Sequence, residues 1–242
     1  MKDGIAPLDP RSTDDIEAAV RLHTLLLPRS PVVQLGPEFM RHFYYRTLIE
    51  DGLLCCDLYY WQGDAAGFIA YTKHASSFLA SGLRRHWVFL AALMVWVTLR
   101  HPARLMVMLR VLGMMRGRRG RTGSISEGES LSFGVLPEYR SREFVGRTGR
   151  RISMELFEGV REYFRRERIS SFRFLTEADN REALLFYHAM GGRFLQDSPE
   201  GGRTVEVICP TGETHATGTN EDPVLFRKVR ATGATARRRS SP

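Results

Sequence analysis

Glycine and arginine are concentrated between residues 140 and 151, directly after a run of strand-forming residues. Gly146 and Gly149 lie in this stretch, and a segment with apolar residues at helical spacing follows it. The first N–H groups of a helix have no partner within the helix, and the helix dipole makes that end positive. Glycine also lets a phosphate approach the main chain closely. The pattern predicts an anion-binding site at the helix start, with arginine side chains beside it.

Two sequence blocks carry more specific information. The first, Leu131-Ser-Phe-Gly-Val-Leu-Pro-Glu-Tyr-Arg140, resembles the fourth strand and the following turn of the GNAT (GCN5-related) acetyltransferases. The second runs from Glu177-Ala-Asp-Asn180 to Phe194 and resembles the Asn…Ala…Phe-Tyr…Gly-Phe signature of the same family. The two blocks follow each other in the order and spacing of that family.

The resemblance implies a mixed α/β sheet with the GNAT acyl-CoA N-acyltransferase fold. It also implies acetyl-CoA or another acyl-CoA as cosubstrate, and no metal. The backbone of Phe133 and Val135 would pair with the pantetheine arm, as an added strand does. Main-chain amides from Val145 to Arg150 would hold the pyrophosphate. The residues expected to contact the cofactor are Phe133, Gly134, Val135, Arg140, Val145, Gly146, Arg147, Thr148, Gly149, Arg150, Asn180 and Tyr187.

The segment after Arg140 departs from the family pattern, which would place glycines at positions 143 and 145. Glu143 and Val145 stand there, and Gly146 and Gly149 follow later as Gly-x-x-Gly. Either the loop contains a short insertion and still surrounds the pyrophosphate, or the cofactor site is altered. We favour the insertion, because the helical register after Gly149 is regular.

Transfer to an amine needs groups that move protons. Tyr187 matches the family tyrosine that protonates the departing CoA thiolate, although a core aromatic residue would also fit there. An amine must lose a proton before it attacks a thioester, and Glu129 is the preferred base candidate, with Glu127 and Glu177 as alternatives. Asn180 matches the family asparagine near the pantetheine, and it would equally serve as a helix cap.

The same resemblance places the acceptor between the first two helices and the sheet. Residues that could bind or deprotonate an amine occur in that region: His23, Arg29, His42, Tyr44 and Tyr45. Each of them also fits a core or surface role. The amine acceptor therefore stays open, among a small amine, an amino sugar, a protein N-terminus and a lipid-linked intermediate.

Hydrophobic periodicity and turn residues predict the elements that hold these groups. The expected order is β-α-α-β-β, a helical insert, and then β-α-β-α-β-β. The strands are expected at 5–8, 53–61, 66–73, 129–136, 172–176, 194–195 and 205–209. The helices are expected at 14–27, 37–50, 149–167 and 179–190, with capping boxes starting at Asp14 and Asp179. The βαβ crossover implies locally parallel strands in a mixed sheet.

Residues 78–122 interrupt this order, and we expect them to be helical from 78 to 115. The run from Trp87 to Leu99 has no charged residue, and a second apolar run follows at 105–115. Neither run reaches the roughly 20 residues needed to span a bilayer. Residues 84–121 fit a helical hairpin on the cytoplasmic membrane surface or a cover over an apolar acceptor. A buried subdomain and a homodimer interface fit them as well.

The formal net charge of +8 favours an anionic partner, such as a phosphorylated cofactor or a membrane face. Nucleic-acid binding is not expected, because the arginines are spread over separate segments without a recognised motif. The three cysteines lack metal-ligand spacing, and the N-terminal residues have no apolar leader. We therefore expect a cytoplasmic protein, peripheral at the inner face of the membrane if the insert binds lipid.

The sequence predicts one GNAT-like domain over residues 1–210 and a polar, disordered tail over 211–242. The favoured function is transfer of an acetyl or other acyl group from CoA to an amine, by direct attack in a ternary complex. The alternative is a catalytically degenerate GNAT domain that binds acyl-CoA or acts as a scaffold at a membrane. The altered glycine segment is the feature that supports the alternative.

Overall fold

The computed structural model describes residues 2–100, 127–195 and 204–212 of the 242-residue chain. These residues belong to one compact unit, Met1–Gly212. The expected tail from residue 213 onward and the part of the insert after residue 100 lie outside the described residues. The expected domain limits therefore stay a prediction.

Seven strands form one mixed sheet in the order β1-β2-β3-β4-β5-β7-β6. The strands are β1 (Gly4–Pro7), β2 (Cys55–Trp61), β3 (Asp64–Thr72), β4 (Gly128–Val135), β5 (Ser171–Glu177), β6 (Arg193–Leu195) and β7 (Thr204–Pro210). β4 and β5 run parallel, and the other neighbouring strands are antiparallel. The mixed α/β class expected from the sequence is confirmed.

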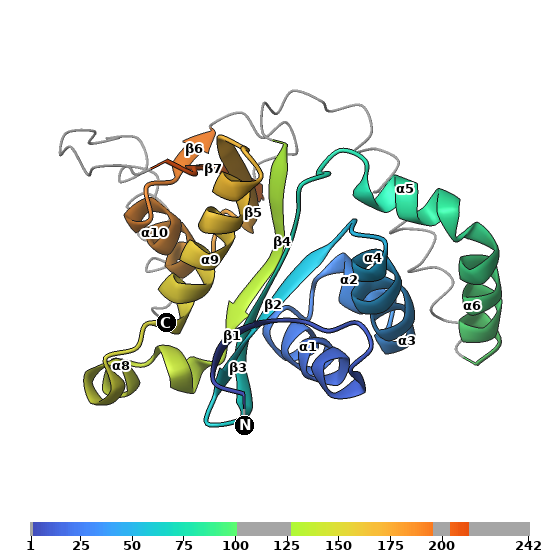
Figure 1. Cartoon of the computed structure of the whole chain (residues 1–242), viewed down its shortest axis with the longest axis horizontal. Helices are drawn as coiled ribbons and strands as arrows, with labels where there is room; N and C mark the ends of the chain where they lie inside the picture. Colours follow the sequence, from blue (N-terminus) through green and yellow to red (C-terminus); the bar gives the residue numbers. More distant parts are fainter. Residues whose placement is uncertain (1, 101–126, 196–203, 213–242) are drawn as a thin grey trace, which may run out of the picture. The chain divides into compact units, whose positions relative to one another are not determined.

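Helices cover both faces of this sheet (Figure 1). Those before β4 are α1 (Thr13–Leu26), α2 (Pro31–Gln34), α3 (Pro37–Phe39), the π-helix η1 (Met40–Thr47), α4 (Leu48–Glu50), α5 (Phe78–Arg85) and α6 (Trp87–Arg100). Those after β4 are the 3-10 helix η2 (Pro137–Arg140), α8 (Arg142–Thr148), α9 (Ile152–Arg166) and α10 (Arg181–Ala189). The helices from α1 to α4 lie on one face, and α9 and α10 lie on the other.

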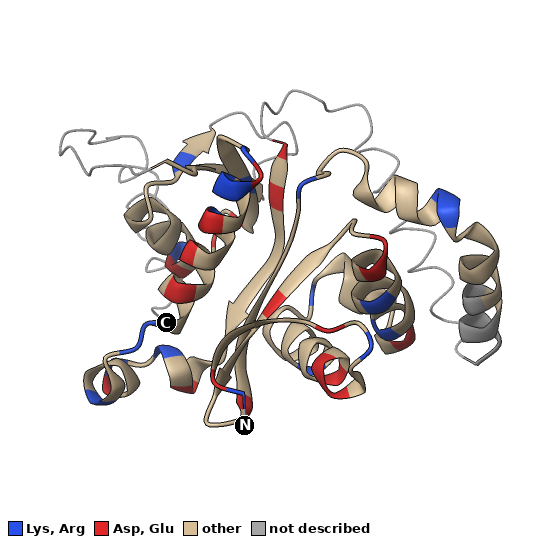
Figure 2. Ribbon diagram, viewed as in Figure 1, with Lys and Arg blue, Asp and Glu red and all other residues tan. Residues whose placement is uncertain are grey.

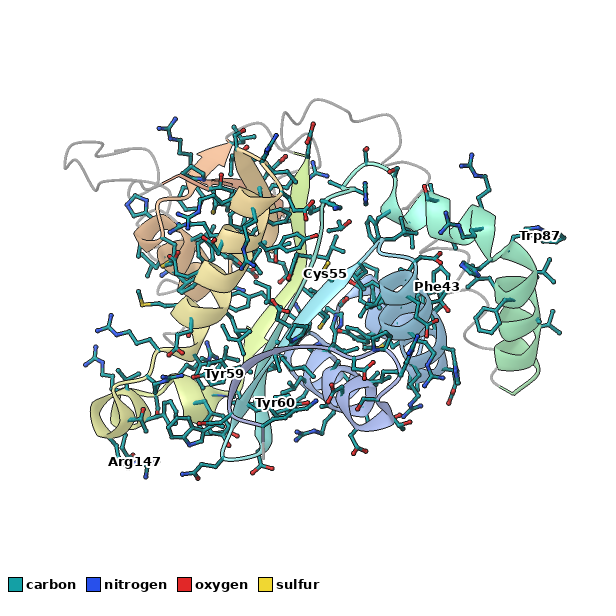
Figure 3. All side chains as sticks on the ribbon, in the orientation of Figure 1. Phe43, Cys55, Tyr59, Tyr60, Trp87 and Arg147 are labelled. Atoms are coloured by element: carbon teal, nitrogen blue, oxygen red, sulfur yellow. The ribbon has the colours of Figure 1, made fainter. Side chains whose placement is uncertain are left out.

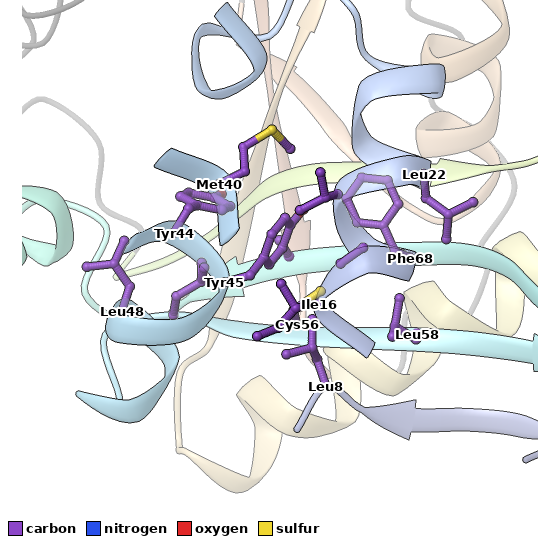
Figure 4. Packing of buried hydrophobic residues seen from close by; sticks show 14 of the residues in the cluster. Leu8, Ile16, Leu22, Met40, Tyr44, Tyr45, Leu48, Cys56, Leu58 and Phe68 are labelled. Atoms are coloured by element: carbon purple, nitrogen blue, oxygen red, sulfur yellow. The ribbon is translucent and has the colours of Figure 1, made fainter. Parts of the chain in front are cut away.

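A first core lies between the sheet and the helices α1, η1 and α4. Leu22, Phe43, Tyr45 and Phe68 are fully buried in it, and part of this packing is seen in Figure 4. The sequence predicted a helix over 37–50, and the chain is helical there. Its central part is a π-helix, whose wider turn rotates successive residues less than an α-helix does. Tyr44 is consequently buried together with its two neighbours.

A second core lies between the sheet and α9. Ile152, Leu156, Val160 and Phe164, which follow one another at i+4 spacing, are each at most 1% exposed. Burying each such side chain contributes about 1.5–3 kcal/mol. The ring of Phe164 lies 4.9 Å from that of Phe172 on β5. This contact fixes α9 across the junction of β4 and β5.

Two helix caps differ from the sequence expectation. α1 starts after Ser12, whose hydroxyl accepts a hydrogen bond from the N–H of Asp15, so Asp14 is not the cap. α10 starts after Asn180, whose side chain accepts from an N–H of the first turn, so Asp179 is not the cap. Each segment contains several residues able to cap, and the backbone conformation selects one of them.

The described part of the insert consists of two helices rather than one. α5 ends at Arg85 and α6 begins at Trp87, with His86 between them. The expected continuation to residue 115 lies outside the described residues. Within the described ranges, no helix combines the length and the apolar character needed to cross a membrane.

Candidate active site

β4 and β5 pair over three residues each and then separate. Residues 128–130 of β4 pair with residues 172–174 of β5, whereas β4 continues to Val135 and β5 to Glu177. The register with β3 places Leu131 in a β-bulge at this point, which bends the strand. Beyond the bulge, no described strand pairs with the β5-facing edge of β4. Backbone groups on that edge can pair with an extended ligand.

Side chains of β4 alternate between the two faces beyond the bulge. A Cβ atom on Gly134 would lie 2.9 Å from Cδ1 of Leu26, so glycine at this position allows α1 to approach the strand closely. Phe133 faces the other side, with its ring 5.7 Å from that of Phe186 on α10. Val135 is buried in the second core. Phe133 and Val135, expected along the pantetheine, and Gly134 between them thus belong to the part of β4 whose β5-facing edge pairs with no described strand.

The glycine-containing segment after β4 is a helix, and the expectation of a loop is wrong. The hydroxyl of Ser141 caps α8 by accepting from the N–H of Phe144, and Gly146 lies within the helix. Gly149 ends it in the left-handed conformation, with φ of 69°. The N–H groups of Val145 and Gly149 donate to carbonyls of this segment. The N–H of Arg150 donates to the hydroxyl of Thr148 at 3.2 Å. Hydrogen bonds within the segment therefore occupy at least three of the amides expected at the pyrophosphate.

The start of α9 contains a cluster of charged and polar side chains. Nη2 of Arg150 lies 2.7 Å from the hydroxyl of Tyr59 and 3.0 Å from Oε2 of Glu155. Oε1 of Glu155 accepts from the N–H of Arg151 at 3.2 Å. The first N–H groups of a helix, here from Ile152 onward, lack intrahelical partners. The helix end and the two arginines favour an anion, and the Glu155 carboxylate opposes it.

The other residues expected near the phosphates lie on the surface. Arg140 forms an ion pair with Glu182 of α10. Arg147 is exposed at the far end of α8 (Figure 3). The hydroxyl of Thr148 donates to a carbonyl of α8 at 2.8 Å. Among these four side chains of the expected phosphate site, the structure brings only Arg150 to the start of α9.

Tyr187 lies on α10 and packs against β5. Its ring centre is 4.4 Å from that of Phe174, and burial raises the pKa of its phenol. The hydroxyl therefore keeps its proton at neutral pH and can donate it. Asn180 is exposed, and its side-chain oxygen accepts the capping hydrogen bond of α10. This capping hydrogen bond is sufficient to explain an asparagine at position 180. A contact between Asn180 and pantetheine stays a prediction.

Glu129 lies where β4 and β5 still pair, and its side chain is buried. Arg173 of β5 donates from Nη2 to Oε2 of Glu129 at 2.8 Å. The two alternative base candidates are exposed: Glu127 directly precedes β4, and Glu177 ends β5 at 4.0 Å from Arg29. A charge-assisted hydrogen bond holds Glu129 in one orientation.

His23 of α1 lies at the centre of a buried hydrogen-bond network. Its Nδ1 is 2.7 Å from the hydroxyl of Tyr45, and its Nε2 is 3.1 Å from Oγ of Ser30 and 3.3 Å from Oγ of Ser132. The ring is completely buried, and burial lowers its pKa to about 4, so it is neutral at pH 7. The network joins α1 and η1 to β4 beside the bulge.

Tyr44 packs against Tyr45 with ring centres 5.0 Å apart, next to this network. Burial raises the pKa of both phenols. His42 and Arg29 are exposed and do not take part. Of the five residues expected near the acceptor, the structure thus brings His23, Tyr44 and Tyr45 together.

Sequence reasoning missed four residues of this region: Ser132, Tyr59, Glu155 and Arg173. Two of them carried a usable signal. Ser132 is a polar residue between the apolar Leu131 and Phe133, and Arg173 lies between two phenylalanines of a strand. A polar or charged group at such a position needs a partner, which is a reason to search for one.

No protein-family model matches this sequence, and no curated protein matches it. The structure of SsHAT is similar to this chain at 16% identity and a TM-score of 0.52, covering 87% of this chain and 100% of that one. An aminoglycoside 6'-N-acetyltransferase complexed with coenzyme A is similar at 9% identity and a TM-score of 0.49, covering 87% and 98%. A chain of the NatC complex bound to Gag peptide and CoA is similar at 16% identity and a TM-score of 0.47, covering 87% and 99%.

At such identities the likeness concerns the fold alone. The single parallel pair in an otherwise antiparallel sheet agrees with the mixed sheet expected from the sequence. The described part of the chain therefore has the GNAT acyl-CoA N-acyltransferase fold.

Proposed function

We propose that this protein is an acyltransferase that moves an acetyl or other acyl group from CoA to an amine, by direct attack in a ternary complex. The separation of β4 from β5 after Ser130 is the observation that carries the proposal. The amides of pantetheine can pair with the β4 edge over 131–135, as an added strand does. No covalent enzyme intermediate is required.

The start of α9 is the proposed position of the pyrophosphate. The amides of Val145 and Gly149 are hydrogen-bonded within α8. The proposed main-chain donors to the pyrophosphate are therefore the N–H groups in the first turn of α9, which begins at Ile152. Arg150 lies beside this turn and supplies the positive side chain. The exposed Arg140 and Arg147 and the half-buried Thr148 would contact the outer part of the nucleotide.

Tyr187 is the proposed general acid. The amine nitrogen forms a bond to the thioester carbon, and the carbon–sulfur bond then breaks. The phenol of Tyr187, which burial keeps protonated, gives its proton to the departing thiolate. A strand amide near the bulge at Leu131 would polarise the carbonyl oxygen during the attack.

The attacking amine must also lose a proton, and Glu129 is the proposed acceptor of it. Arg173 holds one oxygen of this carboxylate. The proton would reach the carboxylate directly or through water. Glu127 and Glu177 are the alternatives, and both lie at strand ends in contact with solvent.

A second candidate function is an acyl-CoA-binding module or scaffold without catalysis. The observation in its favour is α8, which replaces the glycine loop of the family pattern. Calorimetric titration of the full chain with acetyl-CoA, followed by thiol-release assays with a panel of amines, separates the two. Binding together with turnover supports the enzyme, and binding without turnover of any amine supports the module. Absence of binding would contradict both.

A further inference from the structure

α6 exposes large apolar side chains to solvent in several directions. Trp87, Val88 and Phe89 are 67%, 61% and 43% exposed, and Val95 is 60% exposed. A surface helix of a globular protein normally turns its apolar residues toward the core and its polar residues outward. Leu90 is the only side chain described on α6 that is buried in the core. Among the described residues, the outward side chains of α6 therefore form an apolar surface that no other element covers.

The contacts of α5 and α6 with the core do not involve the exposed apolar side chains. α5 is fixed by Gly82, which packs closely on Leu48 and Phe43, and Leu90 anchors the first turn of α6. α6 lies farther from the sheet than the helices α2 to α4, with Trp87 on its outer side (Figures 1 and 3). Among the described residues, the contacts that hold α6 in place are at its first turn.

Positive charge adjoins the apolar surface, and acidic residues are absent from it. Arg84 and Arg85 are exposed at the end of α5, and only His86 separates them from Trp87. Figure 2 shows both signs of charge on α9 and α1 but no acidic residue along the described part of α5 and α6. The sequence has no aspartate or glutamate between Asp64 and Glu127. Asp51, which pairs with Arg85 at 3.2 Å, is the acidic neighbour of this region.

An apolar helix with arginines at its edge has the chemistry of an interfacial membrane helix. Its fourteen residues span about 21 Å at 1.5 Å per residue. The described part of α6 is thus shorter than the roughly 30 Å hydrocarbon core of a bilayer. Lying in the headgroup region, it could insert its apolar side chains among acyl chains and place both arginines at lipid phosphates.

We propose that the end of α5 and the start of α6, residues 84–92, dock this protein on an anionic phospholipid bilayer. Trp87, Val88 and Phe89 enter the interface, and Arg84 and Arg85 contact the headgroups. The proposal does not depend on acyl transfer, because neither α5 nor α6 supplies a residue to the proposed active site.

The test is flotation of the full chain with vesicles of phosphatidylglycerol and phosphatidylcholine, compared with vesicles of phosphatidylcholine alone. We expect partitioning at least tenfold stronger with the anionic vesicles, falling with added salt. The triple variant Trp87→Ser, Val88→Ser, Phe89→Ser should lose at least tenfold in partitioning. Leu25→Ser, which removes an equally exposed apolar side chain from α1, is the matched control and should bind as the native protein does.

Two further measurements distinguish lipid from other occupants. Lipids brominated on their acyl chains should quench the fluorescence of the native protein more than that of Trp87→Phe, because Trp87 enters the interface. Light scattering without vesicles reports the oligomeric state. A dimer that the triple variant dissociates would assign the surface to a second copy of the chain and overturn the proposal. Unchanged vesicle binding of a folded triple variant would overturn it as well.

Discussion

The two faces of the central sheet differ in how they are built beside β4. Beneath α1 and η1, His23 is hydrogen-bonded to Tyr45 and Ser132 inside the core. Beneath α9 and α10, the neighbours are mainly aromatic rings, such as Tyr187 on Phe174. Buried polar groups need partners in defined directions, whereas rings need only matched surfaces. The first face is therefore fixed by hydrogen bonds and the second by ring packing.

We call the side of the sheet under α9 and α10 the aromatic face, and the side under α1 and η1 the polar face. The substitution with the largest expected effect concerns the aromatic face. Tyr187→Phe keeps the packing on Phe174 and removes the hydroxyl. We expect kcat to fall about a hundredfold, the lower range for loss of a general acid, with unchanged affinity for acetyl-CoA. Thiol-release kinetics and calorimetry measure the two quantities. The matched control is Tyr163→Phe, which removes a hydroxyl from α9 that contacts Cys55. Equal losses in both variants would assign Tyr187 a structural role only.

The polar face should make the stability of the protein depend on pH through His23. Burial lowers its pKa from 6.5 to about 4, so the folded state binds this proton less readily than the unfolded state. The stabilising contribution is present above pH 6.5 and is lost as the pH falls toward 4. The free energy of unfolding should decrease by roughly 2 kcal/mol over that range, as measured by urea unfolding.

His23→Gln should remove this part of the pH dependence, even though the substitution lowers stability at every pH. His42→Gln changes an exposed histidine and should leave the dependence as it is. If the free energy of unfolding of His23→Gln still decreases between pH 6.5 and 4 as in the native protein, His23 does not cause this pH dependence.

A third substitution probes the start of α9, which belongs to the aromatic face. Gly149 has a left-handed conformation, which asparagine and aspartate both tolerate better than other residues with side chains. Gly149→Asp adds a carboxylate near the helix start, and Gly149→Asn adds the same shape without charge. We expect the dissociation constant for CoA to be about tenfold higher for the aspartate variant. Equal constants in calorimetry would show that the pyrophosphate lies elsewhere.

The smallest expected effect tests the one buried carboxyl group described on the aromatic face. Asp57 accepts a hydrogen bond from Tyr71 at 3.0 Å, and burial raises its pKa. The protonated form therefore stabilises the fold below the unfolded pKa of about 3.9, and this contribution is lost as the pH rises through the folded pKa. Asp57→Asn should be about 1 kcal/mol more stable at pH 7 and equal to the native protein near pH 4.

Thermal unfolding at the two pH values checks this prediction. Asp64→Asn, at the exposed start of β3, is the control and should change stability by less than about 0.5 kcal/mol. A destabilised Asp57→Asn at pH 7 would show that the carboxylate is required on the aromatic face.

Much of the fold could be predicted from local pattern. The i+4 spacing of Ile152, Leu156, Val160 and Phe164 predicted both α9 and its buried side. The same reasoning failed from Arg142 to Gly149, because glycines there were interpreted as a loop. The Ser141 cap and the helical hydrogen bonds outweigh one glycine inside a helix, which costs about 1 kcal/mol relative to alanine.

The candidate site could be predicted only in part, because its partners are distant in sequence. Arg173 reaches Glu129 only through the register of β4 with β5. Ser132 reaches His23 across 109 positions. Periodicity places a residue on a face of an element, but it does not determine which elements are neighbours or in which register.

The short contact between β4 and β5 also offers a practical assay. Among the described residues, it is the only strand pairing that joins β1–β4 to β5–β7, and it consists of three residue pairs. A compound that bridges the two strands beyond this contact would slow the exchange of nearby backbone hydrogens with deuterium. Exchange mass spectrometry on the peptides containing residues 128–135 and 171–177 could therefore rank acyl-CoA compounds before any acceptor is known. The protein would report its own ligand without turnover.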